Sequence, residues 1–124
     1  GEMSRIMLAL KSIVAERDSI QTLVFDEIDT GISGETARVV AEKILKLSEN
    51  HQIIIISHLP QIVSVSTHHF HVNKDISNGK TFSVLEKLNQ MEREVVLSQL
   101  IFGKEYTPET LEAARKMLNN KTRI

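Results

Sequence analysis

Two short apolar blocks of this 124-residue chain each end in polar residues that could do chemistry. Residues 22–25 (TLVF) run directly into Asp26 and Glu27, and residues 52–56 (QIIII) run into Ser57-His58. One carboxylate can hold the water shell of a magnesium ion, which prefers oxygen ligands and keeps several waters. The other can orient or deprotonate an attacking water, and an imidazole can donate to a phosphate oxygen where charge develops. These residues therefore predict a metal-assisted attack of water on a phosphate group.

The side chains meet only if the two blocks are neighbouring strands of one sheet. The hydrophobicity of each block is continuous rather than alternating, which is typical of parallel strands buried on both faces. Between them lies a run with apolar residues at helical spacing, namely Ala37, Val40, Ala41, Ile44 and Leu47. A strand-helix-strand crossover is almost always right-handed, and its parallel strands bring both carboxyl ends to one edge. We therefore expect Asp26, Glu27 and His58 to converge at that edge, where open α/β sheets bind ligands.

Further elements are predicted on either side of this crossover. Apolar spacing predicts a helix over residues 3–14. Residues 68–73 and 81–88 have the pattern of two strands joined through Asn78-Gly79, a dipeptide that favours a tight turn. We expect this hairpin to close the sheet.

Two helices are predicted after the hairpin. One covers residues 91–101 and stops before Gly103, and the other opens at Thr107-Pro108 and reaches Leu118. The predicted class is α/β, with a parallel sheet core, flanking helices and a C-terminal β-hairpin followed by helices.

Composition excludes several classes of protein. The chain has no cysteine, which removes disulfide scaffolds, zinc ribbons and thiol nucleophiles. Its formal charge of −1 gives no electrostatic footprint for nucleic acid. The longest uninterrupted apolar run, Ile53–Ile56, is far shorter than the roughly 20 residues that cross a bilayer. We expect no membrane partner and a cytoplasmic location.

Several segments resemble motifs of the ATP-binding-cassette ATPases. Residues 22–27 (TLVFDE) resemble a Walker B strand with its catalytic glutamate, residues 29–34 (DTGISG) resemble the D-loop, and residues 56–58 (ISH) resemble the switch histidine. Residues 1–10 (GEMSRIMLAL) resemble the end of the signature motif and the helix it caps. Within this family, residues 26–34 and 57–61 are most similar to the SMC-like DNA-repair ATPases of bacteria.

The resemblance implies a fold and a task for each residue. It implies part of a P-loop NTPase-like fold, the head of an ATP-binding-cassette ATPase, with ATP and Mg²⁺ as cofactors. Asp26 would assist Mg²⁺, Glu27 would polarise the lytic water, and His58 would contact the γ-phosphate. Four further residues would contribute to nucleotide binding between two heads, two in the D-loop and two at the signature end: Ser33, Gly34, Gly1 and Glu2.

A P-loop is missing from the chain, because no Gly-x-x-x-x-Gly-Lys-Ser/Thr occurs. Residues 74–81 (KDISNGKT) come near it, but Lys74 replaces the first glycine and a strand is predicted to follow. We therefore expect residues 1–124 to be the C-terminal portion of a head, without its P-loop lobe and coiled coil. The implied partners are that lobe, a second head with ATP, and DNA at the nucleoid. Alone, the chain is expected neither to bind ATP tightly nor to hydrolyse it.

Two other functions remain open from the sequence. Asp26, Glu27, Asp29 and His58 could form the divalent-ion cluster of a stand-alone metal-dependent phosphoesterase. Alternatively, the hairpin or the C-terminal helices could be the docking surface of a non-catalytic interaction module. The run at residues 68–71 (HHFH) is predicted to be structural, because strand alternation leaves at most two imidazoles on one face.

Overall fold

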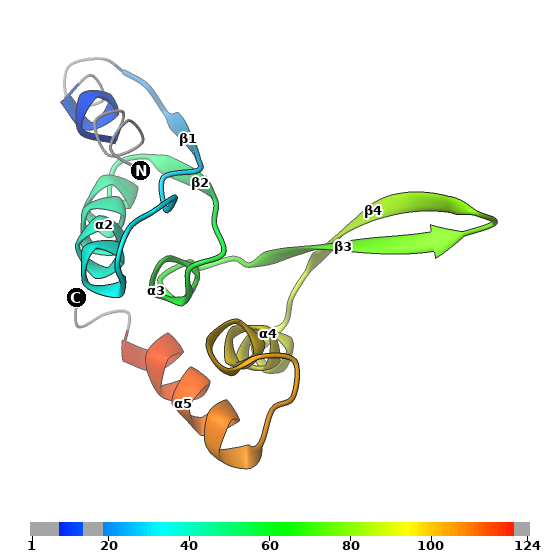
Figure 1. Cartoon of the computed structure of the whole chain (residues 1–124). Helices are drawn as coiled ribbons and strands as arrows, with labels where there is room; N and C mark the ends of the chain where they lie inside the picture. Colours follow the sequence, from blue (N-terminus) through cyan, green and yellow to red (C-terminus); the bar gives the residue numbers. More distant parts are fainter. Residues whose placement is uncertain (1–7, 14–18, 121–124) are drawn as a thin grey trace. The chain divides into compact units, whose positions relative to one another are not determined.

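The computed structural model describes residues 8–13 and 19–120 (Figure 1). The described residues divide into two compact units, one ending at Val65 and the other beginning at Ser66. The first unit contains a two-stranded parallel sheet with helices, and the second contains an antiparallel hairpin and two helices. The α/β class is therefore confirmed. Among the described residues, no helix is long and apolar enough to cross a membrane.

The first unit is built on the strand-helix-strand crossover that the sequence predicts. Strand β1 (Thr22–Asp26) and strand β2 (Gln52–Ile56) pair in parallel, with Asp26 opposite Ile56 at their carboxyl ends. Helix α2 (Gly34–Ser48) connects them. Its buried residues belong to the predicted apolar stripe: Ala37, Val40, Ala41 and Ile44.

The two faces of the parallel sheet differ in burial. One face packs in the core with α2 and carries Leu23, Phe25, Ile53 and Ile55. On the other face Val24, Ile54 and Ile56 are 49%, 47% and 59% exposed. The prediction that these strands are buried on both faces is wrong for this chain, because no described residue of the first unit buries the second face. Continuous hydrophobicity shows what the strands can bury, and among the described residues only one of their faces is buried.

Two short helical segments complete the first unit. Residues 8–13 are helical, and the rest of the helix predicted over residues 3–14 lies outside the described residues. Lys11 Nζ donates to the carbonyl of Val24 at 2.6 Å and lies 4.9 Å from the centroid of the Phe25 ring. Helix α3 (Pro60–Val63) follows β2 and packs against α2.

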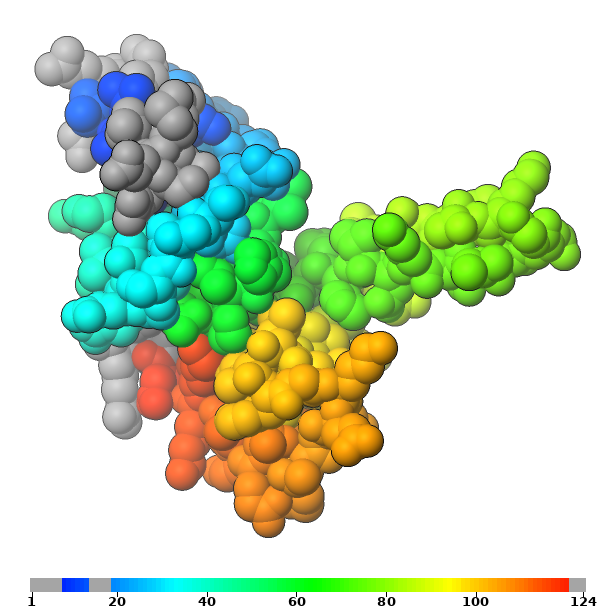
Figure 2. Space-filling view, in the orientation of Figure 1, coloured from blue at the N-terminus to red at the C-terminus, as the bar shows by residue number. Residues whose placement is uncertain are grey.

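The second unit begins with an antiparallel hairpin. Strand β3 (Phe70–Ser77) pairs with strand β4 (Lys80–Lys87), as Figure 1 shows, and Figure 2 shows the atoms of this segment packed together in light green. Asn78 and Gly79 form the turn with φ values of 51° and 73°, as a two-residue turn with positive φ requires. The predicted hairpin and turn are confirmed, but both strands extend up to the turn.

The hairpin does not close the parallel sheet, so that prediction is wrong. Among the described residues it forms a separate two-stranded sheet. One face of this ribbon carries exposed apolar side chains, namely Phe70, Val72, Ile76 and Leu85. The strands of the hairpin therefore build no core of their own.

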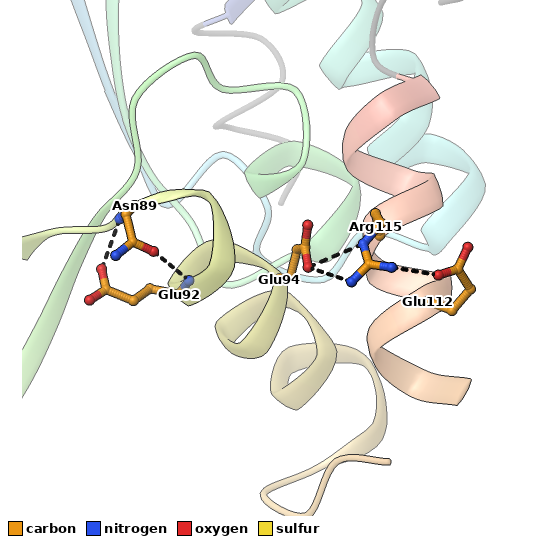
Figure 3. Close-up of polar contacts among 5 residues, drawn as sticks. All are labelled: Asn89, Glu92, Glu94, Glu112 and Arg115. Atoms are coloured by element: carbon orange, nitrogen blue, oxygen red, sulfur yellow. Dashed lines mark hydrogen bonds and ion pairs between the residues drawn. The ribbon is translucent and has the colours of Figure 1, made fainter. Parts of the chain in front are cut away.

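Helices α4 (Gln90–Phe102) and α5 (Pro108–Asn119) complete the second unit. Asn89 and Glu92 form a capping box at the start of α4, in which Asn89 Oδ1 accepts from the Glu92 amide at 2.9 Å (Figure 3). The helix ends at Gly103, where φ is 99°. Thr107 caps α5, and Pro108 occupies its first turn. The predicted boundaries of both helices are therefore close to those observed.

An ion cluster joins α4 to α5. Arg115 lies between Glu94 of α4 and Glu112 of α5, with nitrogen-to-oxygen distances of 3.1 and 2.8 Å (Figure 3). Leu97 of α4 and Ala114 of α5 are both 0% exposed. Apolar burial and this cluster together stabilise the helix pair.

Candidate functional site

The carboxyl ends of β1 and β2 lie side by side, as predicted. The register places Asp26 opposite Ile56, so Asp26 and Glu27 leave the sheet beside the point where Ser57-His58 leave it. Asp26, Glu27 and His58 are all exposed there. The crossover therefore brings the three predicted residues to one edge of the sheet within the first unit.

Glu27 has an unusual backbone conformation. Its φ is 58°, a left-handed value that few residues other than glycine adopt. Residues held in this way cost on the order of 1 kcal/mol or more and often occur at functional sites. The conformation ends the strand at once and starts a turn, in which the amide of Thr30 donates to the Glu27 carbonyl at 3.5 Å. Asp26 and Glu27 thus leave the strand with different backbone conformations.

Asp29 is a buried carboxylate that links the two strand ends. Its side chain is only 4% exposed, and its Oδ2 atom accepts from Ser57 Oγ at 2.6 Å and from the His58 amide at 3.0 Å. The same oxygen lies 3.2 Å from His58 Nδ1. Ser57 Oγ in turn accepts from the Leu59 amide at 3.1 Å. These contacts fix the loop after β2 against the loop after β1.

The electrostatics of this network favour an ionised Asp29. Burial alone would raise the pKa of its carboxyl group, but the hydrogen bonds from Ser57 and from the His58 amide outweigh burial, and the nearby imidazole adds to them. The pKa of Asp29 is therefore lower than its ordinary value. The imidazole of His58 is 75% exposed, so the ring is held at one side and open to solvent at the other.

Ser33 and Gly34, which the resemblance assigns to a D-loop, have structural tasks in this chain. Ser33 is the N-cap of α2, where its hydroxyl oxygen accepts from the Thr36 amide at 3.2 Å. A side chain at Gly34 would place its Cβ 3.1 Å from Gln61 Nε2, so the first residue of α2 is closely approached from the start of α3. Both residues lie in the segment that follows Glu27. Gly1 and Glu2 lie outside the described residues.

Sequence reasoning did not identify the part that Asp29 plays. The sequence placed it in the D-loop or in a metal cluster, whereas the structure pairs it with Ser57 and His58. The available signal was a serine immediately before the histidine at the end of the second strand. Such a hydroxyl can satisfy a buried carboxylate from the neighbouring strand end.

The metal cluster of the phosphoesterase alternative is not formed. In residues 8–13 and 19–120, no group of three or more His, Cys, Asp or Glu side chains is placed to hold a metal ion. Asp29 Oδ2, which that cluster would need, already accepts from Ser57 and His58. The geometry therefore favours separate tasks for the acidic residues over a shared metal centre.

The second unit contains a different concave surface, which is open and has a volume of about 460 Å³. It is lined by His71 and Glu86 of the hairpin and by Met91, Glu92 and Val95 of α4, among others. Its neighbour His69 has a pKa lowered by burial and by the charges of Arg93 and His71. Glu92 is already engaged in the capping box of α4. This surface lacks the consecutive carboxylates of the sheet edge.

Comparison with known proteins finds relatives that are named DNA repair protein RecN. No protein-family model matches the chain. It is 36% identical over 124 residues to DNA repair protein RecN of Bacillus subtilis and 38% identical over 124 residues to RecN of Halalkalibacterium halodurans. It is also 41% identical over 119 residues to RecN of Haemophilus influenzae. These matches cover 100%, 100% and 96% of the chain, respectively.

This chain is homologous to the C-terminal part of RecN. The matches cover 22%, 22% and 21% of the three RecN proteins, so the chain spans about a fifth of their length. Both strand ends of the candidate site lie in the region matched to RecN of B. subtilis, because that match covers the whole chain.

Proposed function

We propose that this chain is the part of a RecN-type ATPase head that supplies the acidic pair and the switch histidine for ATP hydrolysis. The observation that carries the proposal is the pairing of β1 with β2, which brings Asp26, Glu27 and His58 to one sheet edge. The homology to proteins named DNA repair protein RecN supports a task in DNA repair. In this proposal the fold is part of a P-loop NTPase-like head.

Each residue at the edge has its own task. A bound magnesium ion would neutralise part of the negative charge of the phosphates. Asp26, exposed at the end of β1, holds the ion or its waters. Glu27 orients the lytic water and takes up its proton, and His58 contacts an oxygen of the terminal phosphate. Ser33 and Gly34 shape the D-loop between two heads, and Gly1 and Glu2 belong to the signature end.

The donor set fits a magnesium ion bound through few protein ligands. Mg²⁺ usually keeps several waters and is held by one or two carboxylates together with substrate phosphates. Asp26 and Glu27 are exposed consecutive carboxylates, whereas Asp29 is already satisfied by Ser57 and His58. The triphosphate itself needs a glycine-rich loop with lysine, which the sequence lacks. ATP binding therefore requires the P-loop lobe of the head.

The exposed face of the parallel sheet supports a partner from the same polypeptide. Parallel sheets are almost always covered on both faces, yet Val24, Ile54 and Ile56 are exposed on one of them. We place the P-loop lobe over this face and beside β2. In the whole protein, two such heads would bind ATP between them, with DNA as the substrate of the repair reaction and the cytoplasmic nucleoid as the location.

The proposal is tested in a chimera, because the chain alone is expected to be inactive. RecN of B. subtilis is prepared with this chain in place of its own matching segment, and ATP hydrolysis is measured. We expect turnover by the chimera and a loss of about 10²-fold or more when Glu27→Gln is introduced. The His58→Gln chimera should also lose turnover while still binding nucleotide.

Two results would contradict the proposal. One is a folded, nucleotide-binding chimera whose turnover is unchanged by Glu27→Gln. The other is ATP hydrolysis by the isolated 124-residue chain that Glu27→Gln abolishes, because that activity would need no P-loop lobe. Glu35→Gln is the matched control, since it removes an exposed carboxylate in the first turn of α2 and should leave turnover unchanged.

A further inference from the structure

Asp29 and His58 form a pair whose geometry decides which ring nitrogen of His58 faces outward. Asp29 Oδ2 lies 3.2 Å from His58 Nδ1 and accepts from the backbone amide of the same residue at 3.0 Å. The carboxylate is thus in contact with both the backbone and the ring of His58. Two contacts to one residue restrict the ring more than either contact does alone.

The chemistry of the pair fixes the position of the proton. A negatively charged carboxylate oxygen 3.2 Å from a ring nitrogen attracts an N–H group and repels a lone pair, so it favours a hydrogen on Nδ1. Asp29 is ionised at neutral pH, because its side chain is 4% exposed but is satisfied by Ser57 Oγ at 2.6 Å as well as by His58. The 3.2 Å contact therefore favours the Nδ1–H form of neutral His58, which leaves Nε2 for an external ligand.

We propose that Asp29 is a positioning residue that holds His58 in its Nδ1–H form with Nε2 directed to the reaction site. This inference rests on the proposed function for the identity of the ligand, a phosphate oxygen or the lytic water. Neutral His58 then offers Nε2 as an acceptor, and the imidazolium offers Nε2–H as a donor.

Ser57 belongs to the same hydrogen-bond network. Its hydroxyl donates to Asp29 Oδ2 at 2.6 Å and accepts from the Leu59 amide at 3.1 Å. It therefore fixes the carboxylate relative to the loop that carries His58. The Ser57→Ala variant keeps Asp29 and should retain the Nδ1–H form with a reduced excess.

The experiment reads the His58 tautomer directly and needs no nucleotide. The 124-residue chain is labelled with ¹⁵N in its histidine rings, and the His58 signals are assigned by comparison with His58→Gln. We expect the Nδ1–H form to exceed the Nε2–H form by about tenfold in the wild type, because the Asp29 charge 3.2 Å away attracts the Nδ1–H dipole and repels a lone pair there. In Asp29→Ala the excess should disappear, while Asp29→Asn should restore part of it through its carbonyl oxygen.

Three outcomes decide the question. A dominant Nε2–H form in the wild type would overturn the inference even if Asp29→Ala failed to fold. So would a folded Asp29→Ala chain with an unchanged tautomer. A change of equal size in the control Asp26→Asn, which removes the carboxylate at the end of β1, would also overturn it. Because no ATP is present, failure of the proposed ATPase activity would leave this measurement valid, and the two ideas fail separately.

Discussion

Asp29 is a residue whose ionisation is coupled to the folding of the first unit. Its pKa in the folded chain is lower than the ordinary value of about 3.9. The unfolded chain therefore binds a proton at higher pH than the folded chain does. It follows that the stabilisation is fully present above about pH 4 and is lost as the pH falls through the folded pKa.

This pH dependence of the stability gives the first prediction. At pH 7, Asp29→Asn should lower the free energy of unfolding by about 1–3 kcal/mol, because charge-assisted hydrogen bonds at a buried site are weakened. The difference between wild type and variant should shrink as the pH falls from 5 toward 2. Urea unfolding measured across that range tests it. A constant difference at all pH values would show that the Asp29 charge contributes nothing to stability.

Glu27 gives a second prediction, which separates backbone strain from side-chain chemistry. Its φ of 58° is easily adopted by glycine but costs other residues on the order of 1–2 kcal/mol. Glu27→Gly should therefore raise the free energy of unfolding by about 1 kcal/mol, although it removes a carboxylate.

The matched variant is Glu27→Gln, which keeps the strain and the side-chain volume. It should leave stability within about 0.5 kcal/mol of the wild type, because Glu27 is exposed. Thermal and urea unfolding of both variants give the comparison. If Glu27→Gly were the less stable of the two, the left-handed conformation would not be a source of strain.

At the scale of elements, helix signals in the sequence were the most informative. Thr107 and Gly103 mark helix ends by local hydrogen bonds and φ values, which depend on few neighbours. The pairing of β1 with β2 was also predictable, because α2 fixes the handedness of the connection. In contrast, nothing in the sequence of residues 68–88 indicates whether the hairpin pairs with another strand. The prediction that it closes the parallel sheet was wrong.

The candidate site likewise has residues that the sequence predicts and one residue whose part it does not predict. Asp26, Glu27 and His58 follow from strand ends and topology, which are readable from hydrophobic blocks. Asp29 does not, because its importance depends on a 2.6 Å contact with Ser57, a residue 28 positions away. Local periodicity carries no information on such a pair.

The hairpin yields the third prediction. Gly79 has a φ of 73°, and no atom lies within 4 Å of the position that a Cβ would take. Gly79→Ala should therefore destabilise the hairpin through backbone conformation alone, by about 1 kcal/mol. Gly79→Asn should cost less, because asparagine tolerates left-handed φ better than alanine does.

Amide hydrogen exchange of β3 and β4 measures this effect at the ribbon. Protection should fall in Gly79→Ala and remain closer to the wild type in Gly79→Asn. The amides of α5, which is joined to α4 by the ion cluster, serve as an internal reference and should keep their protection. Equal loss of protection in both variants would indicate steric crowding rather than backbone strain.

At the scale of the whole molecule, the chain exposes apolar surfaces that its own described residues leave uncovered. One is the sheet face with Val24, Ile54 and Ile56, and another is the hairpin face with Val72 and Ile76. The chain spans about a fifth of the length of RecN. A segment of a larger domain would expose surfaces of this kind, because the apolar face of a sheet is buried only when another element packs against it.

The fourth prediction uses this face to test whether the rest of RecN covers it. Ile54 is 47% exposed, so Ile54→Lys should change the stability of the isolated chain by less than about 1 kcal/mol. In the B. subtilis chimera the same lysine would be an unpaired charge under the P-loop lobe and should cost about 3 kcal/mol or more. Ile53→Lys is the control, because Ile53 packs against the core with α2 and its replacement should destabilise the isolated chain and the chimera alike. Chemical unfolding of the parent and both variants, each as isolated chain and as chimera, gives the comparison. A chimera that tolerates Ile54→Lys as well as the isolated chain does would place the P-loop lobe elsewhere.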